Sequence, residues 1–295
     1  MGKTPTGGDP GGGGPDPALQ ELKLRDRLGQ VGGVVAVLSG KGGVGKSTVA
    51  ANLAVALADE GRRVGLLDAD MHGPSVPRIL GLDDARPDCD AGDIQPIACG
   101  PRLKVMSMAF LLDGRDAPVI WRGPLKMAAL RQFIADVRWG PLDVLVIDLP
   151  PGTGDEPLSV CQLIPEAAGG IVVTTPQELS VSDVRKCISF CRALKLPVIG
   201  VIENMSGFVC PHCGETVDVF GAGGGARMAA EMDVPFLGAV PLDPRVVAAG
   251  DEGRPFVRDL PDSSATAAFL TAIGPVRDLV SACPAPESQN GTTRT

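Results

Sequence analysis

The stretch VVAVLSGKGGVGKSTVAANLAVAL, residues 34–57, decides the fold of this chain. It opens with a continuous apolar run at 34–38, passes through a glycine-rich loop, and continues as a helical pattern at 46–59. A strand that leads through such a loop into a helix is the context in which phosphate-binding loops occur. The segment therefore predicts an α/β protein built around a nucleotide site.

Four residues of the loop carry the phosphate-binding signature. Gly40 and Gly45 are separated by four residues, and Lys46 and Ser47 follow directly. Glycines let backbone N–H groups approach phosphate oxygens, and the helix N-terminus adds its positive dipole. We expect Lys46 to neutralise the β- and γ-phosphates and Ser47 to ligate Mg²⁺.

The rest of the chain continues the alternation of strands and helices. Further apolar runs with strand character lie at 64–68, 142–148, 170–174, 198–203 and 236–240. Helical patterns lie at 125–137, 181–194, 224–232 and 263–282, and 94–110 is expected to form a hairpin insertion. Apolar parallel strands joined by crossover helices belong to a sheet that is covered on both faces. We therefore expect a doubly wound α/β fold with a mostly parallel sheet in a single P-loop NTPase domain.

The two ends of the chain depart from this pattern. Residues 1–17 are dominated by glycine and proline, and 284–295 are mostly polar, so both are expected to be disordered tails. The ATPase domain is then expected to span 18–283 and to begin with a short helix at 18–28.

Composition argues against several functions. Hydrophobic residues make up 44% of the 295 positions, and the formal net charge is −8. An acidic chain has no electrostatic footprint for nucleic acid or for an anionic membrane surface. The sequence also has no signal peptide and no apolar run of membrane-spanning length. We expect a cytoplasmic protein that binds neither nucleic acid nor membrane.

Two acidic segments complete the expected nucleotide machinery. Asp68 and Asp70 follow the second strand in LLDADMHGPSVPRILG, and Asp148 ends the apolar run in VIDLPPGTGDE. The carboxyl ends of parallel strands form the ligand-binding edge of an open sheet. Asp148 is expected to hold Mg²⁺ as a Walker B carboxylate. We expect Asp70 to position or activate the attacking water and Asp68 to lie nearer the metal shell, with 150–155 as a switch.

Lys41 is a second lysine on a loop that needs only Lys46 for its phosphates. Two neighbouring ammonium groups repel each other, so Lys41 is expected to point elsewhere. KGGVGKST resembles the deviant Walker A loop of the ATPase class that includes MinD, ParA, ArsA and nitrogenase iron protein. That resemblance implies that Lys41 reaches across a dimer to the phosphates bound by the other subunit. The phosphate cradle that it implies consists of Gly42, Gly43, Val44, Gly45, Lys46, Ser47 and Thr48.

The segment VIENMSGF follows the fifth strand, where a GTPase would carry an Asn-Lys-x-Asp guanine motif. Asn204 in this segment can offer its amide to the edge of adenine, and the resemblance places it there. Pro241, in PLDP, is assigned to the same nucleotide site. ATP is therefore the expected nucleotide.

Cys210 and Cys213 form a Cys-x-x-Cys knuckle within the loop near 205–220. Such a turn can direct two thiolates at one metal. A mononuclear zinc or a 4Fe-4S cluster usually takes four ligands, and the chain has no second Cys-x-x-Cys. One chain thus supplies half a site, which predicts that two pairs meet on the axis of a dimer. A bridging iron-sulfur cluster, a bridging zinc and a redox or structural dithiol are the three alternatives.

The other cysteines lack the spacing of a metal site. Cys187 and Cys191 lie four residues apart on one expected helix and are interpreted as core residues. The remaining four have no partner at a telling distance in the sequence: Cys89, Cys99, Cys161 and Cys283.

Together the motifs resemble the Mrp/ApbC family of iron-sulfur cluster carrier ATPases over about residues 32–282. The matching segments are SGKGGVGKST, LLDADMHGPSVPRILG, VIDLPPGTGDE, VTTPQELSVSDVRK, ENMSGFVCPHCGE and PLDP. The resemblance implies a homodimer that binds a labile 4Fe-4S cluster between its subunits and passes it to apo iron-sulfur proteins, with ATP and Mg²⁺ as cofactors. It makes Cys210 and Cys213 the cluster ligands and Asp70 the switch aspartate.

Two other functions occur among proteins with this loop. A spatial-organising ATPase like MinD or ParA would need an amphipathic membrane-binding tail or a basic DNA-binding face. An electron-transfer ATPase like nitrogenase iron protein holds its cluster with widely separated cysteines. The acidic charge and the tight Cys-x-x-Cys favour a carrier of the cluster itself.

Overall fold

The computed structural model describes residues 17–90, 93–111, 123–164, 167–210, 212–213 and 215–282. The tails expected at 1–17 and 284–295 lie outside the described residues except for Pro17, and Cys283 lies outside them as well.

A mostly parallel sheet forms the centre of the described structure. Its strands are β1 (Val34–Ser39), β2 (Val64–Asp68), β5 (Ile97–Ala98), β6 (Leu103–Ser107), β7 (Val144–Asp148), β8 (Gly169–Thr174), β9 (Val198–Val209), β10 (Thr216–Val217) and β11 (Phe236–Leu242). They are arranged in the order β10-β9-β8-β1-β7-β2-β6-β5, and β11 also pairs with β9. The short strands β5 and β10 run antiparallel to their neighbours, and the other pairings are parallel. The predicted doubly wound architecture is confirmed.

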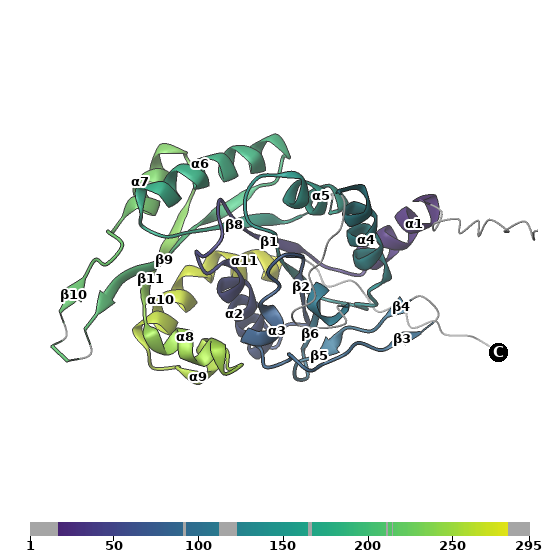
Figure 1. Cartoon of the computed structure of the whole chain (residues 1–295), viewed down its shortest axis with the longest axis horizontal. Helices are drawn as coiled ribbons and strands as arrows, with labels where there is room; N and C mark the ends of the chain where they lie inside the picture. The colour runs from purple at the N-terminus through teal and green to yellow at the C-terminus, as the bar shows by residue number, and fades with distance from the viewer. Residues whose placement is uncertain are drawn as a thin grey trace, which may run out of the picture.

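Helices cover both faces of this sheet (Figure 1). One face carries α1 (Pro17–Leu28), α4 (Gly123–Asp136), α5 (Asp155–Leu163), α6 (Glu178–Ala193) and α7 (Gly224–Glu231). The other carries α2 (Lys46–Asp59), α3 (Val76–Ile79), α8 (Pro244–Asp251), α9 (Phe256–Asp259), α10 (Ser264–Ala272) and α11 (Gly274–Ala282). A 3-10 turn at Met108–Leu111 and a two-stranded hairpin of β3 (Cys89–Asp90) and β4 (Asp93–Ile94) complete the described elements.

The two-sided cover explains why the strands read as continuous apolar runs. Every residue of β1, β2 and β7 is buried, and α2 is buried along nearly its whole length. With both faces of a strand packed against helices, no position is left for a solvent-facing polar residue. Polar side chains therefore gather at the strand ends, where Asp68 and Asp148 face each other as register partners. None of the described helices has both the length and the apolar character needed to cross a bilayer.

Two expectations about single elements need correction, and one helix was missed. The single helix expected at 263–282 is two helices, because Gly274 and Pro275 follow α10 and proline cannot continue its hydrogen-bond ladder. The segment at 94–110 does contain an antiparallel pair, β5 with β6, but β6 also pairs in parallel with β2. Strand β6 therefore belongs to the main sheet, and the segment is not an insertion. Helix α5 was not predicted.

The Cys-x-x-Cys segment is carried by a hairpin at one end of the sheet. Strand β9 runs for 12 residues and its outer part pairs with β10, through Val209 with Thr216 and Phe208 with Val217. Figure 1 shows this hairpin projecting away from the helices that cover the rest of the sheet.

Candidate functional site

The glycine-rich loop joins β1 to α2 at the carboxyl edge of the sheet. Gly45, directly before α2, has a left-handed backbone with φ of 84°, which suits glycine. A Cβ on Gly45 would come within 2.2 Å of the side-chain amide of Asn204, and one on Gly40 would come within 2.4 Å of the Asp183 backbone in α6. The loop is thus closely packed from both sides, and both contacts require glycine.

Lys46 is held against the carboxylate at the end of β7. Its Nζ lies 2.6 Å from Oδ1 of Asp148, while Ser47 Oγ donates to Oδ2 at 2.5 Å. Lys46 is 6% exposed and Asp148 is fully buried. The structure thus brings together the three residues predicted for phosphate and Mg²⁺ from two elements about a hundred positions apart.

The hydroxyl of Ser47 and the carboxylate of Asp148 are hard oxygen donors of the kind that Mg²⁺ prefers. Because they already lie in contact at the mouth of the loop, this pair fits the ion expected there. Mg²⁺ keeps several waters and takes its remaining ligands from phosphates, so two protein oxygens are sufficient.

Among the described residues of this site, three carboxylates are buried, those of Asp68, Asp70 and Asp148, beside the one buried ammonium of Lys46. Burial raises the pKa of Asp148, and the ion pair with Lys46 opposes that shift. Burial and the neighbouring charge of Asp148 raise the pKa of Asp68 to about 8. A bound Mg²⁺ ion would add positive charge at this site and favour the ionised form of its carboxylates.

Asp68 is bound by protein groups on both oxygens. Its Oδ2 accepts from Ser107 Oγ at 3.0 Å and from the backbone N–H of Val76 at 3.3 Å. Its Oδ1 accepts from the backbone N–H of Asp70 at 3.2 Å. These bonds fix the segment after β2, and a place for Asp68 in the metal shell stays a prediction.

Asp70 lies close to this cluster and is 7% exposed. Its Oδ1 accepts from the backbone N–H groups of His72 and Gly73, both at 3.1 Å. Its charge is one of the influences that raise the pKa of Asp148, so Asp70 is near the expected metal position. Its role toward water stays a prediction.

A cavity of about 250 Å³ lies beside the first turn of α2. Asn204 and Pro241 both line it, together with Thr48, Met205 and Asp243. Asn204 donates through Nδ2 to the carbonyl of Val44 in the loop at 2.9 Å, and its own carbonyl oxygen remains for a ligand. The two residues assigned to the base thus share one cavity next to the phosphate cradle.

Lys41 is partly exposed at the start of the loop. Its backbone carbonyl accepts from Ser39 Oγ at 2.9 Å, but within the described ranges its ammonium has no ion-pair or hydrogen-bond partner. This differs from Lys46, whose ammonium is bound inside the chain.

The cysteine knuckle lies at the tip of the β9–β10 hairpin. Cys210 is partly exposed and Cys213 is exposed, with Pro211 and Gly214 outside the described residues. The backbone N–H groups of Cys213 and His212 point at the Cys210 sulfur and lower the pKa of that thiol. The thiolate is the form that binds metal, so this turn is prepared as a ligand.

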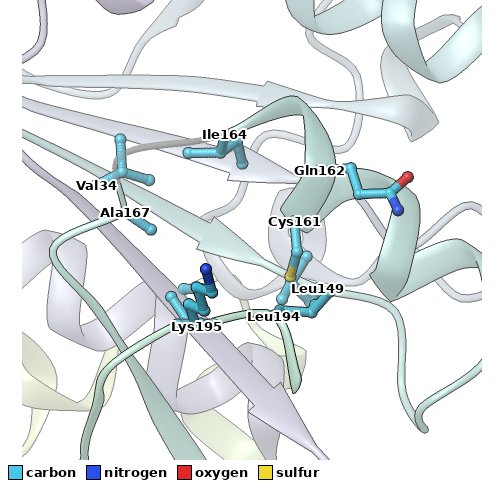
Figure 2. A pocket seen from close by; sticks show the side chains of 10 residues that line it. Val34, Leu149, Cys161, Gln162, Ile164, Ala167, Leu194 and Lys195 are labelled. Carbon is cyan, nitrogen blue, oxygen red and sulfur yellow. The ribbon is translucent and has the colours of Figure 1, made fainter. Parts of the chain in front are cut away.

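A second cavity, of about 200 Å³, lies on the opposite face of the sheet, beneath α5 and α6. Figure 2 shows Cys161 and Lys195 facing it among aliphatic side chains. Burial raises the pKa of Cys161 to about 12, which makes its thiol a poor nucleophile. Cys187 and Cys191 are fully buried in α6, as core residues would be.

The sequence analysis missed Glu203, a fully buried carboxylate on β9 next to Asn204. Glu203 accepts from the backbone N–H groups of Gly223 and Gly225 and from Ser206 Oγ, the last at 2.5 Å. It thereby caps the N-terminus of α7. The glycine run GAGGGA before that helix was the available signal, because its bare N–H groups need a buried acceptor.

The chain matches known proteins along most of its length. The family model described as ParA, NUBPL iron-transfer P-loop NTPase, matches residues 30–276. A protein named iron-sulfur cluster carrier protein from Methanocaldococcus jannaschii is 51% identical over 240 residues, which cover 81% of this chain and 83% of the relative. The cytosolic Fe-S cluster assembly factor NUBP2 of Gallus gallus is 48% identical over 82% of this chain and 90% of its own.

Solved structures give the same result for the fold. A nucleotide-binding protein from Archaeoglobus fulgidus in complex with ADP superposes with a TM-score of 0.70 and 41% identity, covering 80% of this chain and 92% of the other. The cell division ATPase MinD from Pyrococcus furiosus superposes with a TM-score of 0.62 and 25% identity, over 84% of this chain and 99% of the other.

Proposed function

This chain belongs to the ParA-type, NUBPL iron-transfer P-loop NTPases, and we propose that it is an ATP-dependent carrier of a 4Fe-4S cluster. The relatives named as iron-sulfur cluster carriers support the cargo, and the P-loop family supports the nucleotide. The observation that carries the proposal is the solvent-accessible Cys-x-x-Cys of Cys210 and Cys213 at the end of β9, the strand that also holds Asn204.

The cluster is bound between two copies of the chain. Cys210 and Cys213 supply two thiolates, and a 4Fe-4S cluster is normally held by four. A second copy related by two-fold symmetry supplies the other two, because the same residues meet across such an axis. The cluster is the cargo, which leaves when an apo iron-sulfur protein offers its own thiolates.

In the same dimer, ATP binds at the phosphate loop of each subunit. Lys46 releases Asp148 and turns to the β- and γ-phosphates, while Ser47 and Asp148 hold Mg²⁺, which neutralises charge on the phosphates. Asp70 orients the attacking water. The unpaired ammonium of Lys41 reaches the nucleotide of the partner subunit and stabilises the charge that develops in hydrolysis.

The face around Lys41 has features that support docking of a second copy. Leu179, in the first turn of α6, is 79% exposed although it is a large apolar residue. The backbone of Asp183, one turn further along α6, packs against Gly40 beside Lys41. An exposed leucine on the helix that packs against the phosphate loop is typical of a surface that becomes buried in a dimer.

Anaerobic reconstitution with iron and sulfide tests the cargo. Wild type should show the visible absorption and Mössbauer signature of a 4Fe-4S cluster, with about four irons per dimer. Cys210→Ala/Cys213→Ala should bind none, and Cys89→Ala/Cys99→Ala, which changes two cysteines outside the knuckle, should match wild type. A wild type without cluster, or a double knuckle variant with a full cluster, contradicts the proposal.

Transfer to apo-aconitase then tests the carrier role, and a cluster that stays bound while passing electrons identifies a reductase.

A further inference from the structure

Strand β9 runs from the cavity beside α2 to the β9–β10 hairpin that carries Cys210 and Cys213. We call this cavity, which Asn204 and Pro241 line, the base cavity. Asn204 lines the cavity, and Cys210 follows the last residue of β9, six positions later. At about 3.3 Å per residue this is a span of roughly 20 Å along one strand. A displacement of the strand at the cavity therefore has a direct covalent route to the cysteines.

The strand is not regular between these two points. Val240 of β11 pairs with Asn204 and Leu242 pairs with Phe208, so the single residue Pro241 faces three residues of β9. Proline cannot donate to the ladder, and the segment 205–207 bulges out opposite it. Two residues of the bulge have positive φ, Met205 at 56° and Gly207 at 73°.

Met205, in the 205–207 bulge, has an unusual backbone conformation. A left-handed conformation is disfavoured for a methionine, and such positions persist where the surroundings impose them. The Met205 side chain lines the base cavity, and its Cε would lie 3.7 Å from a Cβ on Gly45. Met205 thus lines the place expected for the base, and the end of its side chain lies beside Gly45 of the phosphate loop.

The parts of β9 before and after the 205–207 bulge differ in how firmly they are held. On the inner side Glu203 is fully buried and holds Ser206 and the start of α7. On the outer side, the described part of the hairpin pairs through Phe208 and Val209 with β10 and through Phe208 with β11, and Cys210 N–H donates to the carbonyl of Glu215 at 2.9 Å. Movement at 205–207 would therefore swing the hairpin and leave the inner strand in place.

We infer that Met205 is a positioning residue for cluster binding: a nucleotide base in the cavity sets the backbone of the 205–207 bulge through Met205, and the bulge sets the orientation of Cys210 and Cys213. This inference rests on the proposed function for the identity of the cargo. It adds the residue through which the nucleotide site and the cysteine site communicate. The long, unbranched methionine suits this role because it can repack against an occupied or an empty cavity.

The test measures thiol reactivity in the full-length apo protein, so it does not depend on a cluster. Alkylation rates of Cys210 and Cys213 are followed by mass spectrometry with and without Mg·ADP or a non-hydrolysable Mg·ATP analogue. In wild type the nucleotide should change these rates by about fivefold or more, the lower end of usual couplings between sites. In Met205→Gly, at a nucleotide concentration that saturates the variant as shown by a separate binding titration, the change should fall to less than about twofold.

Matched variants separate this role from a general effect on the backbone. Lys195→Gly places glycine at another non-glycine position with positive φ, of 57°, on the opposite face of the sheet, and should keep the full nucleotide response. Met205→Leu keeps a long apolar side chain in the cavity and should retain most of the response. If Met205→Gly does not fold, Met205→Ala provides the same comparison.

Each outcome decides the inference. A full nucleotide response in Met205→Gly or Met205→Ala refutes it, and so does a wild type whose cysteines ignore the nucleotide. Neither of these results affects cluster binding by wild type, which tests the proposed function alone. A nucleotide response that depends on Met205 in a protein that fails to bind cluster would keep the coupling and reject the cargo.

Discussion

At the scale of single residues, the Asp68 carboxyl is where pH acts on the nucleotide site. Its pKa is raised to about 8, by burial first and by the charge of Asp148 second. In an unfolded chain the same group titrates near 3.9. The folded state therefore binds the proton more tightly, and the free energy of unfolding falls as the pH rises from about 4 to about 8.

The variant Asp68→Asn should flatten this pH dependence in the nucleotide-free, Mg²⁺-free protein. The uncharged amide has no proton to lose, and Asp148 then has the ammonium of Lys46 to itself. The readout is the slope of Tm against pH between 4 and 8, because the amide also loses acceptor capacity toward Val76 and Asp70 and lowers Tm overall. Asp262→Asn, at an exposed position, should keep the wild-type slope. An unchanged slope in Asp68→Asn would show that this carboxyl does not titrate in the range.

At the scale of elements, α7 depends on the buried carboxylate of Glu203. The variant Glu203→Gln replaces one of two oxygen acceptors with a donor, which then faces a backbone N–H of Gly223 or Gly225. Hydrogen bonds to charged groups contribute about 1.5–3 kcal/mol each, so we expect a loss of about 2 kcal/mol in urea unfolding. Glu178→Gln, which alters an exposed ion pair with Arg227, should cost less than about 0.5 kcal/mol. Equal costs for the two variants would contradict the capping role.

The first helix is attached to the domain through Asp93. This carboxylate forms ion pairs with Lys23 and Arg27 of α1, at 2.8 and 2.9 Å, and with Arg138, which follows α4 in the chain, at 2.7 Å. The Lys23 ammonium first, and Arg27 after it, hold the pKa of Asp93 below its usual range. Because a lowered pKa stabilises the folded state above the unfolded value, this contribution is present above about pH 4 and is lost as the pH falls below it.

Hydrogen exchange on α1 should report the loss of this attachment. At pH 7, Asp93→Asn should increase exchange across Pro17–Leu28 several-fold and leave α2 unchanged, because only α1 is held by the cluster. Asp90→Asn, in the exposed strand β3 of the same hairpin, is the matched control. Slow exchange of α1 in the Asp93 variant would mean that apolar packing and the ion pair of Lys23 with Asp136, at 2.7 Å, hold the helix without Asp93.

The elements that could be predicted are those whose pattern is local. The helix expected at 46–59 and the strand at 64–68 have the observed bounds, because buried strands and helices of this fold are apolar throughout. Helix α5 was missed because its sequence DEPLSVCQL has only scattered apolar residues and a proline in its first turn. The parallel pairing of β6 with β2 depends on contacts between segments some 40 residues apart, which no local pattern encodes.

The candidate site divides in the same way. The loop, the acidic residues and the cysteine pair have spacings tied to their chemistry, so they could be proposed from the sequence. Met205 and Glu203 gain their meaning from the bulge opposite Pro241 and from the glycine run before α7. Such residues are found only when the chain segments that surround them are known.

In the molecule as a whole, the proposed roles of Lys41 and Cys210 both need a second copy of the chain. Lys41 has an ammonium without a partner among the described residues, and Cys210 and Cys213 offer two of the four thiolates that a 4Fe-4S cluster usually takes. Under the proposed function, a second copy of the chain would complete both the phosphate loop and the cysteine hairpin. A two-fold dimer would do so with a single interface, because every contact occurs twice.

Mixing two inactive variants tests whether Lys41 acts in the partner subunit. Lys41→Ala binds nucleotide but offers no lysine across the interface, and Lys46→Ala offers Lys41 but loses its own phosphate lysine, so each alone should hydrolyse ATP at least about a hundredfold more slowly than wild type. In an equal mixture, half of the dimers contain one of each, and their single complete site should restore about a quarter of wild-type activity. Circular dichroism and Tm should confirm that Lys41→Ala is folded. A lysine that acted within its own chain would give no recovery on mixing, because neither variant then has a complete site.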